Sequence, residues 1–166
     1  MMFLHALLLL LTGTLAVHVI REDMRNLEIS ALPVFGLGGM LILNGYLFPP
    51  PGLAPSDAYI GACMGLLIGA ATRSYIRWRT GHAGFGEADI VLIGGIGGLL
   101  GPYLIGPWLF AAASTGIVLF MIPAARRSHE SETGTIKVIP FCPTLILSAG
   151  LVHALVLAGL LPANPF

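Results

Sequence analysis

Two aspartates, Asp23 and Asp89, stand where apolar stretches of the chain meet polar ones, and together they could carry out hydrolysis. Asp23 follows the apolar run "MFLHALLLLLTGTLAVHVI", and Asp89 lies in "GFGEADIVLIGGIGGLLG". Two carboxyls that approach closely cannot easily both ionise, so one keeps its proton. The ionised carboxylate can then draw a proton from an attacking water, while the protonated carboxyl stabilises the oxyanion and protonates the leaving group.

Two other roles use the same aspartates. Each could cap a helix at the membrane interface, or the pair could form a proton relay. From residue type and position alone, capping is favoured.

The elements that must position these aspartates are membrane helices. The chain of 166 residues is 56% hydrophobic and 10% charged, whereas about a quarter of the residues in soluble domains are charged. A helix needs about 20 apolar residues to cross a bilayer. Six stretches are candidates: Met2–Ile20, Ala31–Phe48, Asp57–Ile76, Asp89–Ile105, Trp108–Ala124 and Pro140–Leu161. We therefore expect a single membrane-embedded domain over residues 1–166, an all-α bundle of six transmembrane helices.

The basic residues predict the orientation of this bundle. All eight fall in the first, third and fifth connections: Arg21, Arg25, Arg73, Arg77, Arg79, Arg126, Arg127 and Lys137. By the positive-inside rule these connections face the cytoplasm and both termini face outward. Asp23 and Asp89 then share the cytoplasmic boundary. Because Arg21 and Arg25 follow the first apolar run and no basic residue precedes it, we expect a retained helix rather than a signal peptide.

Other residues are assigned structural roles. Glycines spaced by four, as at Gly61, Gly65 and Gly69, predict close helix packing. Asp57 is expected to cap the third helix, on the outer side. Cys63 and Cys142 are expected to be buried small side chains, and no cluster of metal ligands is visible. The segment "RRSHESETGTIK" is interpreted as a polar loop.

Three separated segments resemble motifs of the type IV prepilin peptidases, membrane aspartyl peptidases with a GxGD signature. "GEADIVLIGGIGGLLG" resembles the GxGD segment and its glycine-rich helix, and "DMRNLEIS" resembles the segment that follows the family's first helix. "IPFCPTLILSAG", which begins at Ile139, resembles the opening of the last helix. The resemblance covers essentially the whole chain. Four positions depart from the family pattern: Ala88 replaces a glycine, Ser30 a common proline, Cys142 the glycine of the last motif, and Val91 a lysine often found after the signature aspartate.

The resemblance implies an aspartic endopeptidase without a cofactor or metal. Asp23 and Asp89 would be catalytic, and the motif residues that could contact substrate are Gly86, Glu87, Ala88, Pro140, Phe141 and Pro143. Glu87 could tune the site or bind a basic leader peptide. The expected partners are a prepilin or pseudopilin and membrane lipid, with no nucleic acid, at the inner (cytoplasmic) membrane of a prokaryote in a multi-pass arrangement.

The chain resembles the short form of the family that is associated with tight-adherence pilus systems. It contains no paired CxxC motifs of the kind carried by the larger members, which also methylate their product, so methylation is not implied. An alternative function is a small transporter or channel with Asp23 and Asp89 as a proton or cation relay. Transport sites usually lie near the bilayer midplane, whereas these acids share one boundary.

Overall fold

The computed structural model describes residues 2–26, 30–81, 86–122, 127–131, 134–138, 141–162 and 164. Within them lie six α-helices, one 3₁₀ turn and a two-stranded hairpin. In chain order the elements are α1 (Met2–Asn26), α2 (Ala31–Leu47), α3 (Pro55–Thr80), α4 (Glu87–Leu100), η1 (Pro102–Leu104), α5 (Ile105–Met121), β1 (Arg127–Ser131), β2 (Gly134–Val138) and α6 (Cys142–Leu157). The predicted helical bundle is confirmed, and each helix overlaps one predicted stretch.

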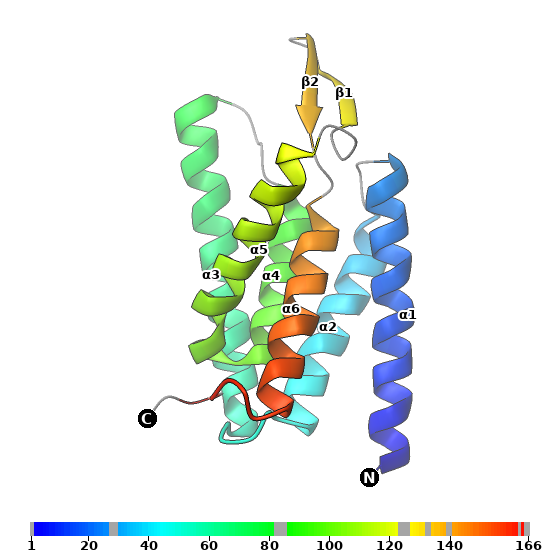
Figure 1. Cartoon of the computed structure of the whole chain (residues 1–166), viewed down its shortest axis with the longest axis vertical. Helices are drawn as coiled ribbons and strands as arrows, with labels where there is room; N and C mark the ends of the chain where they lie inside the picture. Colours follow the sequence, from blue (N-terminus) through cyan, green and yellow to red (C-terminus); the bar gives the residue numbers. More distant parts are fainter. Residues whose placement is uncertain are drawn as a thin grey trace.

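The helices run alternately up and down, so that both chain termini lie at one end of the bundle and the hairpin lies at the other (Figure 1). The end of α1, the start of α4 and the start of α6 lie toward the end that carries the hairpin, which we call the hairpin end. This arrangement brings together segments that are far apart in sequence.

The interpretation of "RRSHESETGTIK" as a loop was wrong. Residues 127–138 contain an antiparallel pair of strands in which Arg127 is opposite Val138 and Ser131 is opposite Gly134. The second strand contains the β-branched residues Thr135, Ile136 and Val138, which favour extended structure. The many polar residues concealed this signal.

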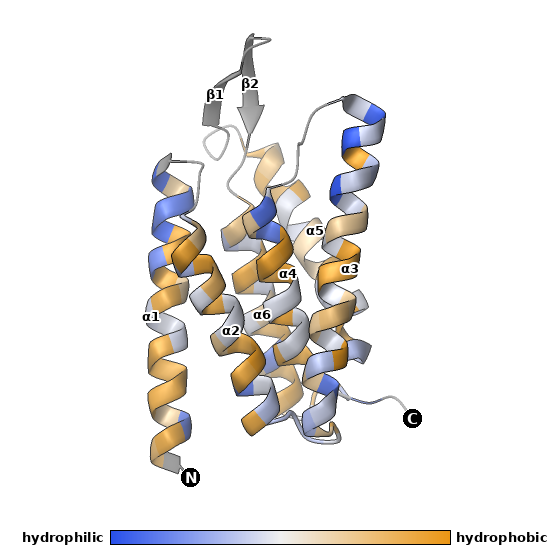
Figure 2. Ribbon diagram, turned by 180° about the vertical axis from the view of Figure 1, so that it is seen from behind, coloured by the Kyte–Doolittle hydropathy of each residue, from blue (hydrophilic) through white to orange (hydrophobic). Residues whose placement is uncertain are grey.

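Apolar side chains cover much of the outer surface of the bundle. Phe3, Leu32 and Phe110 are 83%, 85% and 77% exposed, far beyond the small apolar patches of a soluble monomer. Hydrophilic residues gather at the hairpin end of α1 and α3 (Figure 2). Among the described helices, two segments are long and apolar enough to span a membrane, Phe3–Arg25 and Pro102–Met121. Shorter apolar helices occupy Ala31–Leu47 and Cys142–Leu157.

Helix α4 is at the centre and packs against α2 and α3 through glycines. A Cβ atom added at Gly61 would collide with the carbonyl oxygen of Gly97, and one added at Gly45 would collide with that of Gly98. A Cβ at Gly65 would likewise meet the backbone of Ile93. Since only hydrogen fits at these points, the predicted close packing of the glycine faces is confirmed.

A buried tryptophan connects α5 to α6. Trp108 is 0% exposed, and its indole Nε1–H donates a hydrogen bond of 3.1 Å to the carbonyl oxygen of Leu145. Leu145, Leu92 and Ile96 belong to the same core cluster. The core therefore holds α6 beside α4. The N-terminus of α6 lies at the hairpin end, as does the start of α4 (Figure 1).

Candidate functional site

Asp23 is held inside the bundle near the end of α1. The helix continues to Asn26, six residues beyond the predicted apolar span, because the polar segment Arg21–Asn26 still has helix-forming residues. Asp23 follows Val19 by four positions and therefore lies on the same face. Val19 is 0% exposed and Asp23 only 6%, so the carboxylate points into the protein.

The carboxylate of Asp23 is bound by the start of α6. Its Oδ2 accepts a buried hydrogen bond of 3.0 Å from the backbone N–H of Cys142, the first residue of that helix. The first N–H groups of a helix have no partner within the helix, and the positive end of the helix dipole favours an anion there. Asp23 thus caps α6 from another helix.

Asp89 lies in the first turn of α4 and is partly buried. Its Oδ2 accepts a hydrogen bond of 3.2 Å from the backbone N–H of Gly86, the residue before the helix. Asp57 makes the same contact at the start of α3, where its Oδ2 accepts the N–H of Ala54 at 2.8 Å. The predicted capping role of Asp57 is confirmed, and Asp89 caps its own helix in the same way.

The structure brings Asp23 and Asp89 within electrostatic reach of each other. The two carboxyls are near enough for a weak like-charge repulsion, and Cys142 lies near both of them. The three residues come from α1, α4 and α6. Asp23 and Asp89 thus each accept a backbone N–H at a helix start, Asp23 from α6 and Asp89 from α4.

The residues of the third motif are only partly described. Pro140 lies outside the described residues. Phe141 is partly buried and Pro143 is buried in the first turn of α6, where proline needs no N–H partner. Cys142 is 0% exposed, as predicted. The other cysteine, Cys63, is exposed on α3, so the prediction that it is buried was wrong.

The residues next to Asp89 occupy distinct positions. Gly86 has a φ of −71° and a ψ of 154°, which other residues can adopt, but an added Cβ would lie 3.2 Å from Asp89 Oδ2. Ala88 is helical and packs against the core cluster. It therefore requires no positive φ, and alanine fits where the resembling family has glycine.

Glu87 does not share the environment of Asp89. Its side chain is 82% exposed, and its Oε1 forms an ion pair of 3.0 Å with Arg73 Nη1 on α3. Residues two apart on a helix point in different directions, which explains the separation. The pair links the start of α4 to the last part of α3 at the protein surface.

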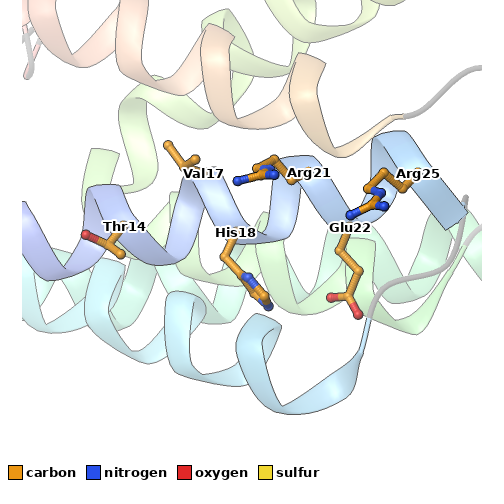
Figure 3. Close-up of a pocket in the computed structure, with 6 residues that line it drawn as sticks. All are labelled: Thr14, Val17, His18, Arg21, Glu22 and Arg25. Carbon is orange, nitrogen blue, oxygen red and sulfur yellow. The ribbon is translucent and has the colours of Figure 1, made fainter.

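A shallow groove lies on the outer face of α1, on the side opposite Asp23. Its volume is about 570 Å³, and it is lined by Thr14, Val17, His18, Arg21, Glu22 and Arg25. Figure 3 shows that all six of these side chains project from α1. Asp23 is absent from this lining, so the groove is a separate feature.

The sequence did not point to the contact between Asp23 and Cys142 or to the pair of Arg73 and Glu87. The contact between Asp23 and Cys142 could have been anticipated in part, because the first N–H groups of a helix that begins after residue 141 need an acceptor from elsewhere. Among the described residues, no group of three or more His, Cys, Asp and Glu side chains could hold a metal ion.

The arrangement can therefore support acid–base chemistry by two carboxyls at one end of a helical bundle. No protein family model, curated protein or solved structure matches the chain.

Proposed function

We propose that the protein is a membrane aspartyl endopeptidase that removes the leader peptide from prepilin-like substrates. The observation that carries the proposal is that Asp23, near the end of α1, and Asp89, in the first turn of α4, come close to each other, where these helix ends lie at the hairpin end of the bundle (Figure 1). The three motifs that resemble prepilin peptidases contain Asp23, Asp89 and Cys142. Cys142 donates a hydrogen bond to Asp23, and Asp89 lies near both residues.

The mechanism follows from two carboxyls that share one proton. The ionised carboxyl takes a proton from water as the water attacks the scissile carbonyl, and the protonated one hydrogen-bonds to the developing oxyanion. Proton transfer to the leaving amine then completes hydrolysis. The N–H groups of Cys142 and Gly86 hold the two carboxylates in fixed positions, so little reorganisation is needed during the reaction.

The membrane placement of the site suits an embedded substrate. In the proposed six-span arrangement, the hairpin end faces the cytoplasm at the inner membrane, since α1 and α3 carry arginines in their last turns and end there (Figure 1). A substrate with a basic leader and an apolar helix would present the junction between them at this depth. The carboxyls would then meet the scissile bond without extraction of the helix from the bilayer.

The proposal is tested with the full chain reconstituted in vesicles and a synthetic substrate. The substrate carries a basic leader, a glycine and then an apolar helix, and its products are identified by mass spectrometry. We expect one cut directly after the glycine, and no cut when that glycine is replaced by a bulky residue. An intact substrate under all conditions, or cuts unrelated to the glycine, would contradict the proposal.

A further inference from the structure

The groove on α1 combines a basic end with an apolar path. Its lining residues, Thr14, Val17, His18, Arg21, Glu22 and Arg25, recur at spacings of three and four, so they share one face of the helix. This face looks away from the bundle, since Val17 is 58% exposed and both arginines are exposed.

The two arginines provide positive charge that the rest of the described structure leaves uncompensated. Arg21 and Arg25 are one helical turn apart (Figure 3), and neither forms an ion pair with any described residue. The acid of the groove, Glu22, is engaged through one oxygen, while its Oε2 is buried and has no hydrogen-bond partner among the described residues. Its Oε1 accepts a hydrogen bond from the hydroxyl of Ser30, and it interacts electrostatically with His18.

An apolar stripe continues from the arginines along α1. Phe3, Leu10 and Val17 follow one another at intervals of seven residues and therefore lie on nearly the same face. They are 83%, 68% and 58% exposed. A molecule that fits this surface has a negative head beside the arginines and a hydrocarbon chain along the stripe.

We propose that this groove binds an anionic phospholipid, with the phosphate between the guanidinium groups of Arg21 and Arg25 and an acyl chain along Val17 and Leu10. Guanidinium groups donate several hydrogen bonds in a geometry that matches phosphate oxygens. Basic residues at the cytoplasmic interface also gain energy from anionic lipid. This inference rests on insertion of α1 in a membrane but not on peptidase activity.

A bound lipid at this position would hold the helix turn that carries Asp23. Residues 21 and 25 lie two positions on either side of Asp23, so they project from the opposite face of the same turns. The lipid would contact the outside of α1 while Asp23 contacts α6 inside. Lipid binding and catalysis thus use separate faces of one helix end.

The test measures lipid binding to the full chain in detergent by native mass spectrometry. Phosphatidylglycerol is titrated against the wild-type protein and against the double variant Arg21→Gln/Arg25→Gln. The matched control is Arg77→Gln/Arg79→Gln, which removes two exposed arginines from the end of α3. Circular dichroism and gel filtration establish that each variant is folded. Phosphatidylcholine with identical acyl chains and free inorganic phosphate complete the set of ligands.

We expect the first double variant to bind phosphatidylglycerol about tenfold more weakly or worse than wild type, and the control to stay within about twofold. Phosphatidylcholine should bind at least about tenfold more weakly than phosphatidylglycerol to the wild-type protein. An equal loss in both double variants would overturn the proposal, because it would indicate only diffuse attraction. Binding of both lipids alike, or displacement of phosphatidylglycerol by millimolar inorganic phosphate, would overturn it as well.

Discussion

Asp23 of α1 accepts the backbone N–H of Cys142 at the start of α6, across 119 positions of sequence. The same carboxylate acts electrostatically on Asp89 of α4. Asp23 therefore joins α1 to α6 by a hydrogen bond and lies near Asp89 of α4, at the end of the bundle where the proposed chemistry occurs.

Replacement of Gly61 by alanine should destabilise the bundle. The added Cβ would collide with the backbone of Gly97, and such overpacking costs about 1–3 kcal/mol. Thermal unfolding in detergent, monitored by circular dichroism, measures the effect. Gly13→Ala is the matched control, because a Cβ at Gly13 meets nothing within 4 Å. That control should be neutral or slightly stabilising, and an equal loss at both positions would contradict the packing described for α3 and α4.

Replacement of Gly86 by alanine should slow leader cleavage while stability changes little. A Cβ at 3.2 Å from Asp89 Oδ2 would displace the carboxylate by a few tenths of an ångström, and a misplaced catalytic group can cost about tenfold to a hundredfold in rate. Alanine is also a poorer helix cap than glycine, by roughly 1 kcal/mol or less. Cleavage rate and melting temperature are compared in the same preparation. A fully active variant would show that this close approach has no catalytic consequence.

The ion pair of Arg73 and Glu87 should contribute little to stability. Because Glu87 is 82% exposed, we expect a coupling energy of about 1 kcal/mol or less. A double-mutant cycle with Arg73→Gln and Glu87→Gln, measured by denaturant unfolding at two salt concentrations, gives this energy. A coupling that is several times larger and independent of salt would indicate a more central role for the pair.

The proposed orientation can be tested by cysteine labelling. In a background of Cys63→Ala and Cys142→Ala, single variants Ser56→Cys and Arg77→Cys are treated with a membrane-impermeant maleimide in intact cells. We expect labelling at position 56 from outside and labelling at position 77 only after the membrane is opened. The reverse pattern would contradict a cytoplasmic hairpin end.

The helices were predictable from the sequence because long apolar runs separated by proline-rich and polar breaks favour helical structure. The extension of α1 from Arg21 to Asn26 lies beyond the predicted apolar span, since it depends on helix propensity and not on apolar content. The hairpin was missed because most residues from Arg127 to Lys137 are polar. Both aspartates were found from their position beside apolar runs and from the motif resemblance. The contact between Asp23 and Cys142 depends on how α1 and α6 pack, and no local pattern encodes it.

The central claim is that Asp23 and Asp89 act together in hydrolysis and do not merely cap helices. The most direct measurement compares leader release by Asp23→Asn, Asp89→Asn and Asp57→Asn in vesicles. Asp57 accepts the same kind of capping bond as Asp89, so its variant reports the effect of a weakened cap alone. We expect folded proteins throughout, a loss of at least about a thousandfold in rate for either of the first two variants, and near-normal cleavage by Asp57→Asn. Substantial cleavage by either Asp23→Asn or Asp89→Asn would contradict the account.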